Sequence, residues 1–465
     1  MFFDSLAFAL FLPVVWGLYW LLRRTRSARL WLLLGASYFF YGWWDARFLA
    51  LIAGSTVLDY CLGRAMFATA DPRRRKRLVT LSLLGNLGAL GFFKYWGFFT
   101  TEFARLLESF GLHANLPLIE VILPVGISFY TFQTLSYTLD IYRGELEPER
   151  DFTRFALFVA FFPQLVAGPI VRARDFLPQL HGAPVLTRTA FHTGLALIFW
   201  GLTKKIVVAD YLGRELVDVF WEAPETFGGF ASLMGIWGYA LQIYGDFSGY
   251  SDVAIGTAML LGFRLADNFN SPYEAISPRD FWRRWHISLS TWLRDYLYIS
   301  LGGNRGGSFA TYRNLMLTMT LGGLWHGASW MFVIWGVYHG GLLVADRLLD
   351  RPAPRSLPGL WARRVLVFHL VCLGWVFFRS MVPTDAWSVL GSLASPRGEA
   401  VLSMGVLVVL AFGFAAHFVP DGVVARLRAG LVHAHPLIQG AIYALWLGLL
   451  MNSHSGQRPF IYFQF

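Results

Sequence analysis

The sequence predicts an all-α protein, a polytopic bundle of transmembrane helices. Of its 465 residues, 56% are hydrophobic and only 15% are charged, whereas a soluble domain usually has about 25% charged residues. The mean hydropathy is +0.49, and apolar runs able to supply the roughly 20 residues of a membrane span recur along the whole chain. No polar stretch is long enough for a separate soluble domain. Residues 1–465 are therefore expected to form a single membrane domain.

The charge and the cysteine content argue against two other classes of protein. The formal net charge is +10 and the pI is about 9.7, but in a membrane protein Lys and Arg gather in cytoplasmic loops. No basic segment lies in a soluble domain, so we expect contact with membrane lipid and none with nucleic acid. Cys61 and Cys372 lie in apolar runs without the spacing of metal ligands. Neither a disulfide framework nor a metal site is expected.

The N-terminal apolar run is predicted to be an uncleaved membrane anchor. It lacks the preceding basic region and the following small-residue cleavage site of a secretory signal. Four arginines follow the run: Arg23, Arg24, Arg26 and Arg29. These arginines and the basic cluster at 73–77 are expected on the cytoplasmic side, with two spans between them and a turn near 44–46.

Further apolar runs bring the expected number of spans to roughly ten to thirteen, some of them re-entrant or interfacial. Their approximate limits are 78–98, 119–142, 152–170, 189–212, 228–245, 250–264, 310–323, 327–349, 361–380, 401–418 and 436–452. The two halves of the chain show no internal repeat. Inverted repeats are common in secondary transporters, so this disfavours the alternative of a transporter or flippase for a polar or lipid-linked substrate.

The longest polar connection, residues 264–313, contains a predicted amphipathic helix. Ser277 is a suitable N-cap, Pro278 suits the first helical position, and Gly302-Gly303 can end the helix. Between these limits the apolar residues fall on one stripe at helical spacing: Trp282, Trp285, Leu289, Trp292, Leu293 and Tyr296. Arginines fall on another face, which is typical of a helix at the membrane interface.

One histidine, His286, lies at the edge of this stripe, four residues after Trp282. We expect it to point toward protein or lipid, and a structural hydrogen-bonding role is open beside a functional one. Arg283 and Arg294 suit an anionic group such as the pyrophosphate of coenzyme A, and they suit lipid phosphates equally well.

A second histidine, His326, lies in the apolar run 315–348. A titratable side chain at membrane depth is costly and tends to face a cavity or the bundle interior. Burial disfavours the charged imidazolium, so a neutral His326 can accept a proton as a general base must, although hydrogen bonding in the core is equally open. His339, thirteen residues on, would face the opposite side of a straight helix, and a structural role is expected for it.

Both His286 and His326 lie in motifs that resemble the membrane-bound O-acyltransferase family. The motifs are RDFWRRWHISLSTWLRDYLY (279–298) and WHG (325–327), in order with LLLGASYFFYGWW, FKYWGFF, LPVGISFYTFQTLSYTLDIYRGE, FFPQLVAGPIVRARDF, YGDFSGYSDVAIG and PFIYFQF. The set covers nearly the whole chain and is most similar to the bacterial branch that includes the membrane subunit of alginate O-acetylation. The resemblance implies a helical bundle with cytoplasmic and outer funnels, His326 as the catalytic histidine, and His286 as the second family histidine.

The resemblance also implies a reaction. A protein of this branch takes an acyl group from a cytoplasmic donor, here acetyl-CoA as a substrate and not as a tightly bound cofactor. It passes the group across the bacterial inner membrane to an exported SGNH-type acetyltransferase, or directly to a hydroxyl of an exported polysaccharide. D-alanyl or longer acyl groups are alternatives.

Two acidic residues in apolar surroundings, Asp246 and Asp252, receive no assigned role. They are suited to hold a histidine tautomer or to line a funnel. Structural pairing with Lys204, Lys205 or an Arg is at least as consistent with the sequence.

Overall fold

The computed structural model describes residues 1–112, 121–166, 168–396, 398, 401–453, 456 and 458–461, and this part of the chain is helical, without strands. The predicted all-α fold is thereby confirmed. The described residues pack as two compact units, one formed mainly by residues 6–185 and the other mainly by 186–262 and 266–465. That the whole chain forms one membrane domain stays a prediction.

Fewer helices meet the length and apolarity of a membrane span than the sequence predicts. Among the described residues four do so, Ala46–Phe67, Pro72–Ser109, Trp330–Leu349 and Leu357–Arg379. The count is five if Met404–His417 and Asp421–His433, which meet at 92°, are one broken span. Several predicted spans are instead short or interrupted helices, because turns and π-helical segments divide their apolar runs.

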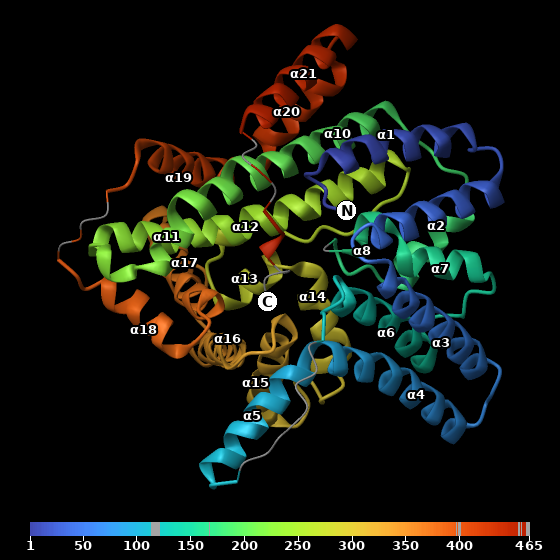
Figure 1. The fold of residues 1–465 in the computed structure, drawn as a ribbon, viewed down its shortest axis with the longest axis horizontal. Helices are drawn as coiled ribbons and strands as arrows, with labels where there is room; N and C mark the ends of the chain where they lie inside the picture. Colours follow the sequence, from blue (N-terminus) through green and yellow to red (C-terminus); the bar gives the residue numbers. More distant parts are fainter. Residues whose placement is uncertain are drawn as a thin grey trace. The chain divides into compact units, whose positions relative to one another are not determined.

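The first unit contains nine α-helices among its described residues (Figure 1). They are α1 (Leu6–Leu21), α2 (Arg26–Gly42), α3 (Leu49–Phe67), α4 (Pro72–Leu90), α5 (Trp96–Ser109), α6 (Ile127–Arg143), α7 (Phe152–Ala160), α8 (Phe162–Leu165) and α9 (Ala173–Phe176). The predicted spans 119–142 and 152–170 thus become α6 and the short pair α7 and α8, and residues 119, 120 and 167 lie outside the described part.

A buried polar network joins α3, α4 and α6. The carboxylate of Asp59 accepts hydrogen bonds from Ser82 Oγ at 2.6 Å and from Asn86 Nδ2 at 2.8 Å. The Ser82 hydroxyl also lies 2.9 Å from that of Thr138. In a membrane, polar side chains between helices stabilise their association because lipid offers no alternative partners.

The second unit begins with two helices that approach each other closely, α10 (Arg188–Thr203) and α12 (Gly229–Leu260). A Cβ at Gly201 would lie 2.4 Å from the carbonyl oxygen of Gly249, and one at Gly256 would lie 2.5 Å from that of Gly194. The prediction of two spans, 228–245 and 250–264, is wrong, since α12 is one helix of 32 residues. Asp246 and Asp252, which lie within this helix, are paired with Lys205 and Lys204.

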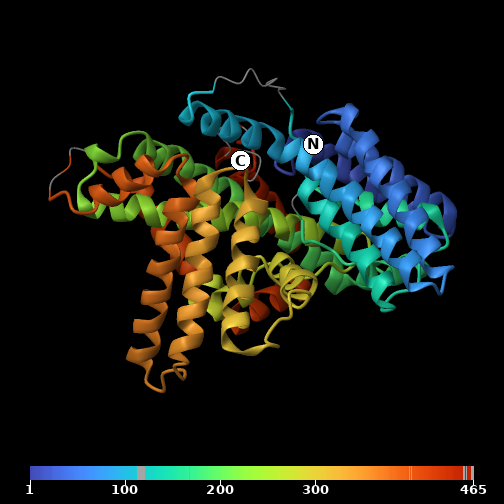
Figure 2. The same cartoon turned by 90° about the horizontal axis from the view of Figure 1, so that it is seen from below.

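The same unit contains three long helices, α15 (Gly307–His326), α16 (Trp330–Leu349) and α17 (Leu357–Arg379). Figure 2 shows α16 and α17 side by side, joined at one end by a loop. The other helices are α11 (Asp218–Glu222), α13 (Pro278–Arg284), α14 (Ile287–Trp292), α18 (Pro383–Ser392), α19 (Met404–His417), α20 (Asp421–His433) and α21 (Pro436–Ser453).

The predicted amphipathic helix between Ser277 and Gly302 is wrong as a single element. Its start is confirmed, because the Ser277 hydroxyl accepts a hydrogen bond from the backbone N–H of Asp280 at 3.2 Å. The helix α13 ends at Arg284, and His286 takes a left-handed backbone conformation with φ of 44°. The stripe of aromatic residues is therefore divided, and its C-terminal half belongs to α14 and the following π-helical segment Leu293–Tyr298.

The contact between α10 and α12 provides a test of the fold. The substitution Gly201→Ala places a methyl group against backbone that cannot move aside, so it should lower the free energy of unfolding by about 1–3 kcal/mol. The control is Gly88→Ala in α4, whose added Cβ would meet nothing within 4 Å. Thermal unfolding in detergent should show a lower midpoint for Gly201→Ala alone, and equal midpoints for the two variants would contradict the close packing.

Candidate active site

His326 is the last residue of α15, next to a sharp reversal of the chain. A Cβ at Gly327 would lie 2.1 Å from the ring of Phe332, so only glycine fits this turn without rearrangement. Ser329 then caps α16, its hydroxyl accepting a hydrogen bond from the backbone N–H of Met331 at 3.2 Å. The reversal leaves His326 only 4% exposed.

Aromatic rings enclose the His326 imidazole. Its ring centroid lies 5.1 Å from that of Trp335 and 5.3 Å from that of Phe378, both nearly edge to face. Trp325, its neighbour in the chain, packs at 5.1 Å. These contacts hold the imidazole in one orientation at the end of the helix.

One face of α15, the segment 279–298 and two residues of α16, Trp335 and Leu343, form a cavity of about 570 Å³, and His326 is part of its wall. The α15 residues on the wall recur at helical spacing: Leu315, Thr318, Met319, Gly322 and His326. The volume lies in the range of sites for small molecules and cofactors, roughly 300–1,000 Å³. A buried histidine thus borders a space large enough for a substrate.

Three exposed arginines line the same cavity: Arg279, Arg283 and Arg294. Arg279 Nε donates to a carboxylate oxygen of Asp346 at 2.8 Å, and this hydrogen bond raises the pKa of Arg279. Asp346 lies eleven residues beyond Trp335 in α16, about 16 Å along the helix at 1.5 Å per residue. Because Trp335 contacts His326, the exposed, positively charged part of the cavity and the buried imidazole lie well apart.

His286 is fully buried, at 0% exposure, so it points into the protein as expected, although it lies at a break between two helices and not on one interfacial helix. Its Nδ1 lies 3.1 Å from Oδ1 of Asn268. The same oxygen accepts the hydroxyl of Ser288 at 2.8 Å and lies 3.3 Å from the Ser288 backbone N–H. Since a backbone N–H can only donate, Asn268 presents its oxygen here and His286 carries a proton on Nδ1. The other nitrogen of the neutral ring, Nε2, is then the acceptor.

The two motif histidines do not share the cavity wall. Among the described residues that line the cavity, His326 is present and His286 is not. Trp325 connects them, with its ring centroid 6.1 Å from that of His286 and 5.1 Å from that of His326. Whether both act in one reaction stays a prediction.

His339 does not lie opposite His326, because the run 315–348 is two antiparallel helices and not one straight helix. His339 is 1% exposed, and its ring packs at 4.8 Å from Trp335 and at 5.2 Å from Trp282. A Cβ at Gly374 would lie 2.6 Å from its Nε2. This tight packing favours the structural role that was expected.

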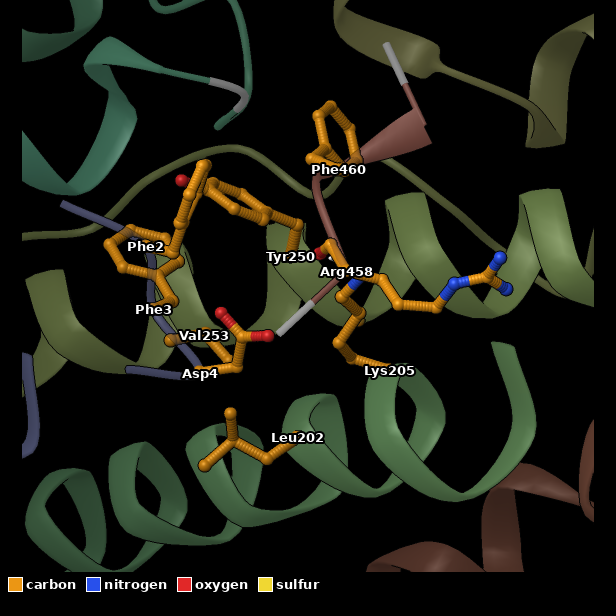
Figure 3. Close-up of a pocket in the computed structure, with 10 residues that line it drawn as sticks. Phe2, Phe3, Asp4, Leu202, Lys205, Tyr250, Val253, Arg458 and Phe460 are labelled. Carbon is orange, nitrogen blue, oxygen red and sulfur yellow. Dashed lines mark hydrogen bonds between the residues drawn. The ribbon is translucent and has the colours of Figure 1, made fainter. Parts of the chain in front are cut away.

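Asp246 and Asp252 form ion pairs with the neighbouring lysines. Lys204 Nζ lies 2.8 Å from Asp252, and Lys205 Nζ lies 2.8 Å from both Asp246 and Asp210. Figure 3 shows Lys205 beside a cavity of about 10 Å³. That volume is about the space of one water molecule, so this second cavity is too small for an acyl substrate.

Sequence reasoning missed the residues that hold the site in place. Asn268 lies in an irregular segment and shows no motif, and Trp335 and Phe378 resemble ordinary core residues. The described residues contain no group of three His, Cys, Asp or Glu side chains able to hold a metal ion.

Comparison with known proteins identifies the family. The protein-family model described as MBOAT, membrane-bound O-acyltransferase family, matches residues 148–381 of the sequence. These residues include both motif histidines. A protein of Azotobacter vinelandii named probable alginate O-acetylase AlgI is 46% identical over 85% of this chain and 78% of its own length. The protein of the same name in Pseudomonas putida is 40% identical over 100% of both chains. A peptidoglycan O-acetyltransferase of Helicobacter pylori is 37% identical over 83% of this chain and 78% of its own.

The chain belongs to the membrane-bound O-acyltransferase family, and it is an O-acyltransferase. The resemblance found in the sequence is thereby confirmed. The transporter alternative is set aside.

The Asn268 contacts predict a measurable effect on stability. Asn268→Ala removes an oxygen that serves His286 and Ser288 inside the protein, so the free energy of unfolding should fall by about 1–3 kcal/mol. Asn270→Ala is the matched control, because Asn270 lies in the same segment and is exposed. Thermal unfolding in detergent, followed by tryptophan fluorescence, should separate the two variants, and a midpoint for Asn268→Ala equal to that of the control would contradict the assigned contacts.

Proposed function

We propose that this protein moves an acetyl group from cytoplasmic acetyl-CoA across the bacterial inner membrane to hydroxyl groups of an exported polysaccharide. An exported SGNH-type acetyltransferase is the partner that makes the final transfer. The observation that carries the proposal is a single cavity with His326 in its buried wall and three arginines at its exposed part. This arrangement suits a substrate with an anionic end and a reactive end.

The arginines suit the anionic part of coenzyme A. Guanidinium groups bind phosphate oxygens through paired, charge-assisted hydrogen bonds. Coenzyme A is too polar to cross lipid, so a donor held at this exposed part extends only its acyl end toward His326. Acetyl-CoA is thus a substrate, and no tightly bound cofactor is needed.

His326 acts as the general base in this proposal. The neutral imidazole of His326 takes the proton of the hydroxyl group of the acetyl acceptor. At the same time the oxygen of that hydroxyl forms the new C–O bond at the thioester carbon. The C–S bond then breaks, and the thiolate of coenzyme A takes up that proton as it leaves. His286 supports the site in this proposal from outside the cavity wall, through Trp325, which packs against both histidines.

The acetyl group is favoured over D-alanyl or longer acyl groups because the relatives at 37–46% identity are named for O-acetylation. Alginate is the first candidate acceptor for the same reason. The Helicobacter pylori relative makes the glycan of peptidoglycan the second candidate.

The first test is His326→Ala in proteoliposomes supplied with labelled acetyl-CoA. Loss of a general base should lower the rate of acetyl transfer by about 10²–10⁴-fold. The control is His433→Ala, at an exposed histidine of α20. If His326→Ala inserts normally and still transfers acetyl at the rate of the control, the proposed role of His326 is wrong.

The second test concerns the arginines. Arg283→Ala should raise the KM for acetyl-CoA about tenfold, the effect of about 1.4 kcal/mol of lost binding. Arg283 is the best choice because Arg279 and Arg294 already bond Asp346 and Asp295. Arg426→Ala, at an exposed position of α20, is the control. An unchanged KM in steady-state kinetics of Arg283→Ala would argue for lipid phosphates as the ligands of these arginines.

A further inference from the structure

Trp335 places a buried hydrogen-bond donor in the wall of the cavity. Its side chain is 1% exposed and lines the same cavity as His326. Its indole Nε1 is shielded from solvent and has no hydrogen-bond acceptor within reach among the residues that the structure describes. Trp282 Nε1, on the same wall, also has no acceptor, and Trp335 is chosen because its ring both lines the cavity and packs against His326.

Packing fixes the orientation of this indole. The Trp335 ring stacks on Trp375 at 6.1 Å and 19°, and meets Phe378 at 5.3 Å. It meets His326 edge to face, with centroids 5.1 Å apart and planes at 85°. The indole N–H is therefore held in the wall beside His326, and a donor fixed by packing needs little reorganisation when charge develops next to it.

The chemistry of indole limits which kind of ligand atom Trp335 can bind. Indole nitrogen donates one hydrogen bond and accepts none, so its partner has to be an acceptor. The carbonyl oxygen of an acyl thioester is such an acceptor. It gains negative charge when a hydroxyl oxygen attacks the carbonyl carbon, and the hydrogen bond then becomes stronger.

We propose that Trp335 is a catalytic residue whose indole Nε1–H hydrogen-bonds the thioester oxygen in the tetrahedral intermediate. The proposal rests on the acyl transfer proposed above. As the C–O bond forms, the hydroxyl proton moves to His326 and the carbonyl electron pair moves to the oxygen facing Trp335. When that pair returns, the C–S bond breaks and the thiolate leaves with the proton from His326.

The test compares two identical substitutions in one aromatic cluster. Trp335→Phe removes the N–H and keeps an aromatic ring, and it should lower kcat for acetyl transfer by about 10²-fold with little change in the KM for acetyl-CoA. Trp375→Phe is the matched control, because Trp375 is 0% exposed, contacts Trp335, and is not among the described residues that line the cavity. It should keep the wild-type kcat. Equal effects of the two substitutions on kcat would overturn the proposal.

A sulfur-substituted acyl donor gives a readout that packing alone would not change. In the dithioester analogue of acetyl-CoA the carbonyl oxygen is replaced by sulfur, a weak hydrogen-bond acceptor. The ratio of the rates with acetyl-CoA and with the analogue should be large for the wild type and for Trp375→Phe, and much smaller for Trp335→Phe. The same ratio in all three proteins would overturn the proposal even if Trp335→Phe is less stable.

The two proposals fail in different ways. If wild-type protein in proteoliposomes moves no acetyl group from acetyl-CoA, the proposed function fails. If the wild type moves acetyl and Trp335→Phe does so at the same rate, only the role of Trp335 is wrong.

Discussion

The close contact between α15 and α16 is the interaction on which the arrangement of the candidate active site depends. A Cβ at Gly323 would lie 2.2 Å from the carbonyl oxygen of Phe332, and one at Gly336 would lie 2.4 Å from that of Met319. Only glycines allow two backbones to approach so closely. The contact places Trp335 of one helix against His326 of the other, and neither the enclosed imidazole nor the cavity wall would exist without it.

Several buried polar side chains in this protein bind specific polar partners within the protein. The surrounding lipid offers them no other hydrogen-bond partners. Asp59 accepts hydrogen bonds from Ser82 and Asn86, and Lys205 lies between two carboxylates. His286 is held by Asn268. In the wall of the cavity beside His326, the indole N–H of Trp335 has no acceptor among the described residues. Buried donors without a partner also occur elsewhere among the described residues, so what singles out Trp335 is its place in the cavity wall against His326.

The sequence predicted the helical fold, which is confirmed, and a catalytic role for His326, which stays a prediction, but not how the surroundings of His326 are assembled. A histidine in an apolar run is costly enough to indicate a cavity or a core, and the WHG motif then pointed to the family. The bend at His286 could not be predicted, because a left-handed conformation at a non-glycine residue depends on the contacts with Asn268, which is distant in sequence. The error over His339 has a similar cause, since helical spacing relates residues only within one unbroken helix.

The central claim is that one cavity connects the exposed arginines with His326. A structure of the protein with bound coenzyme A, determined by electron cryomicroscopy in nanodiscs, tests it most directly. We expect the pyrophosphate to lie among Arg279, Arg283 and Arg294, with the thiol reaching toward His326 along α15. Coenzyme A bound elsewhere, with this cavity empty and His326 out of its reach, would contradict the account.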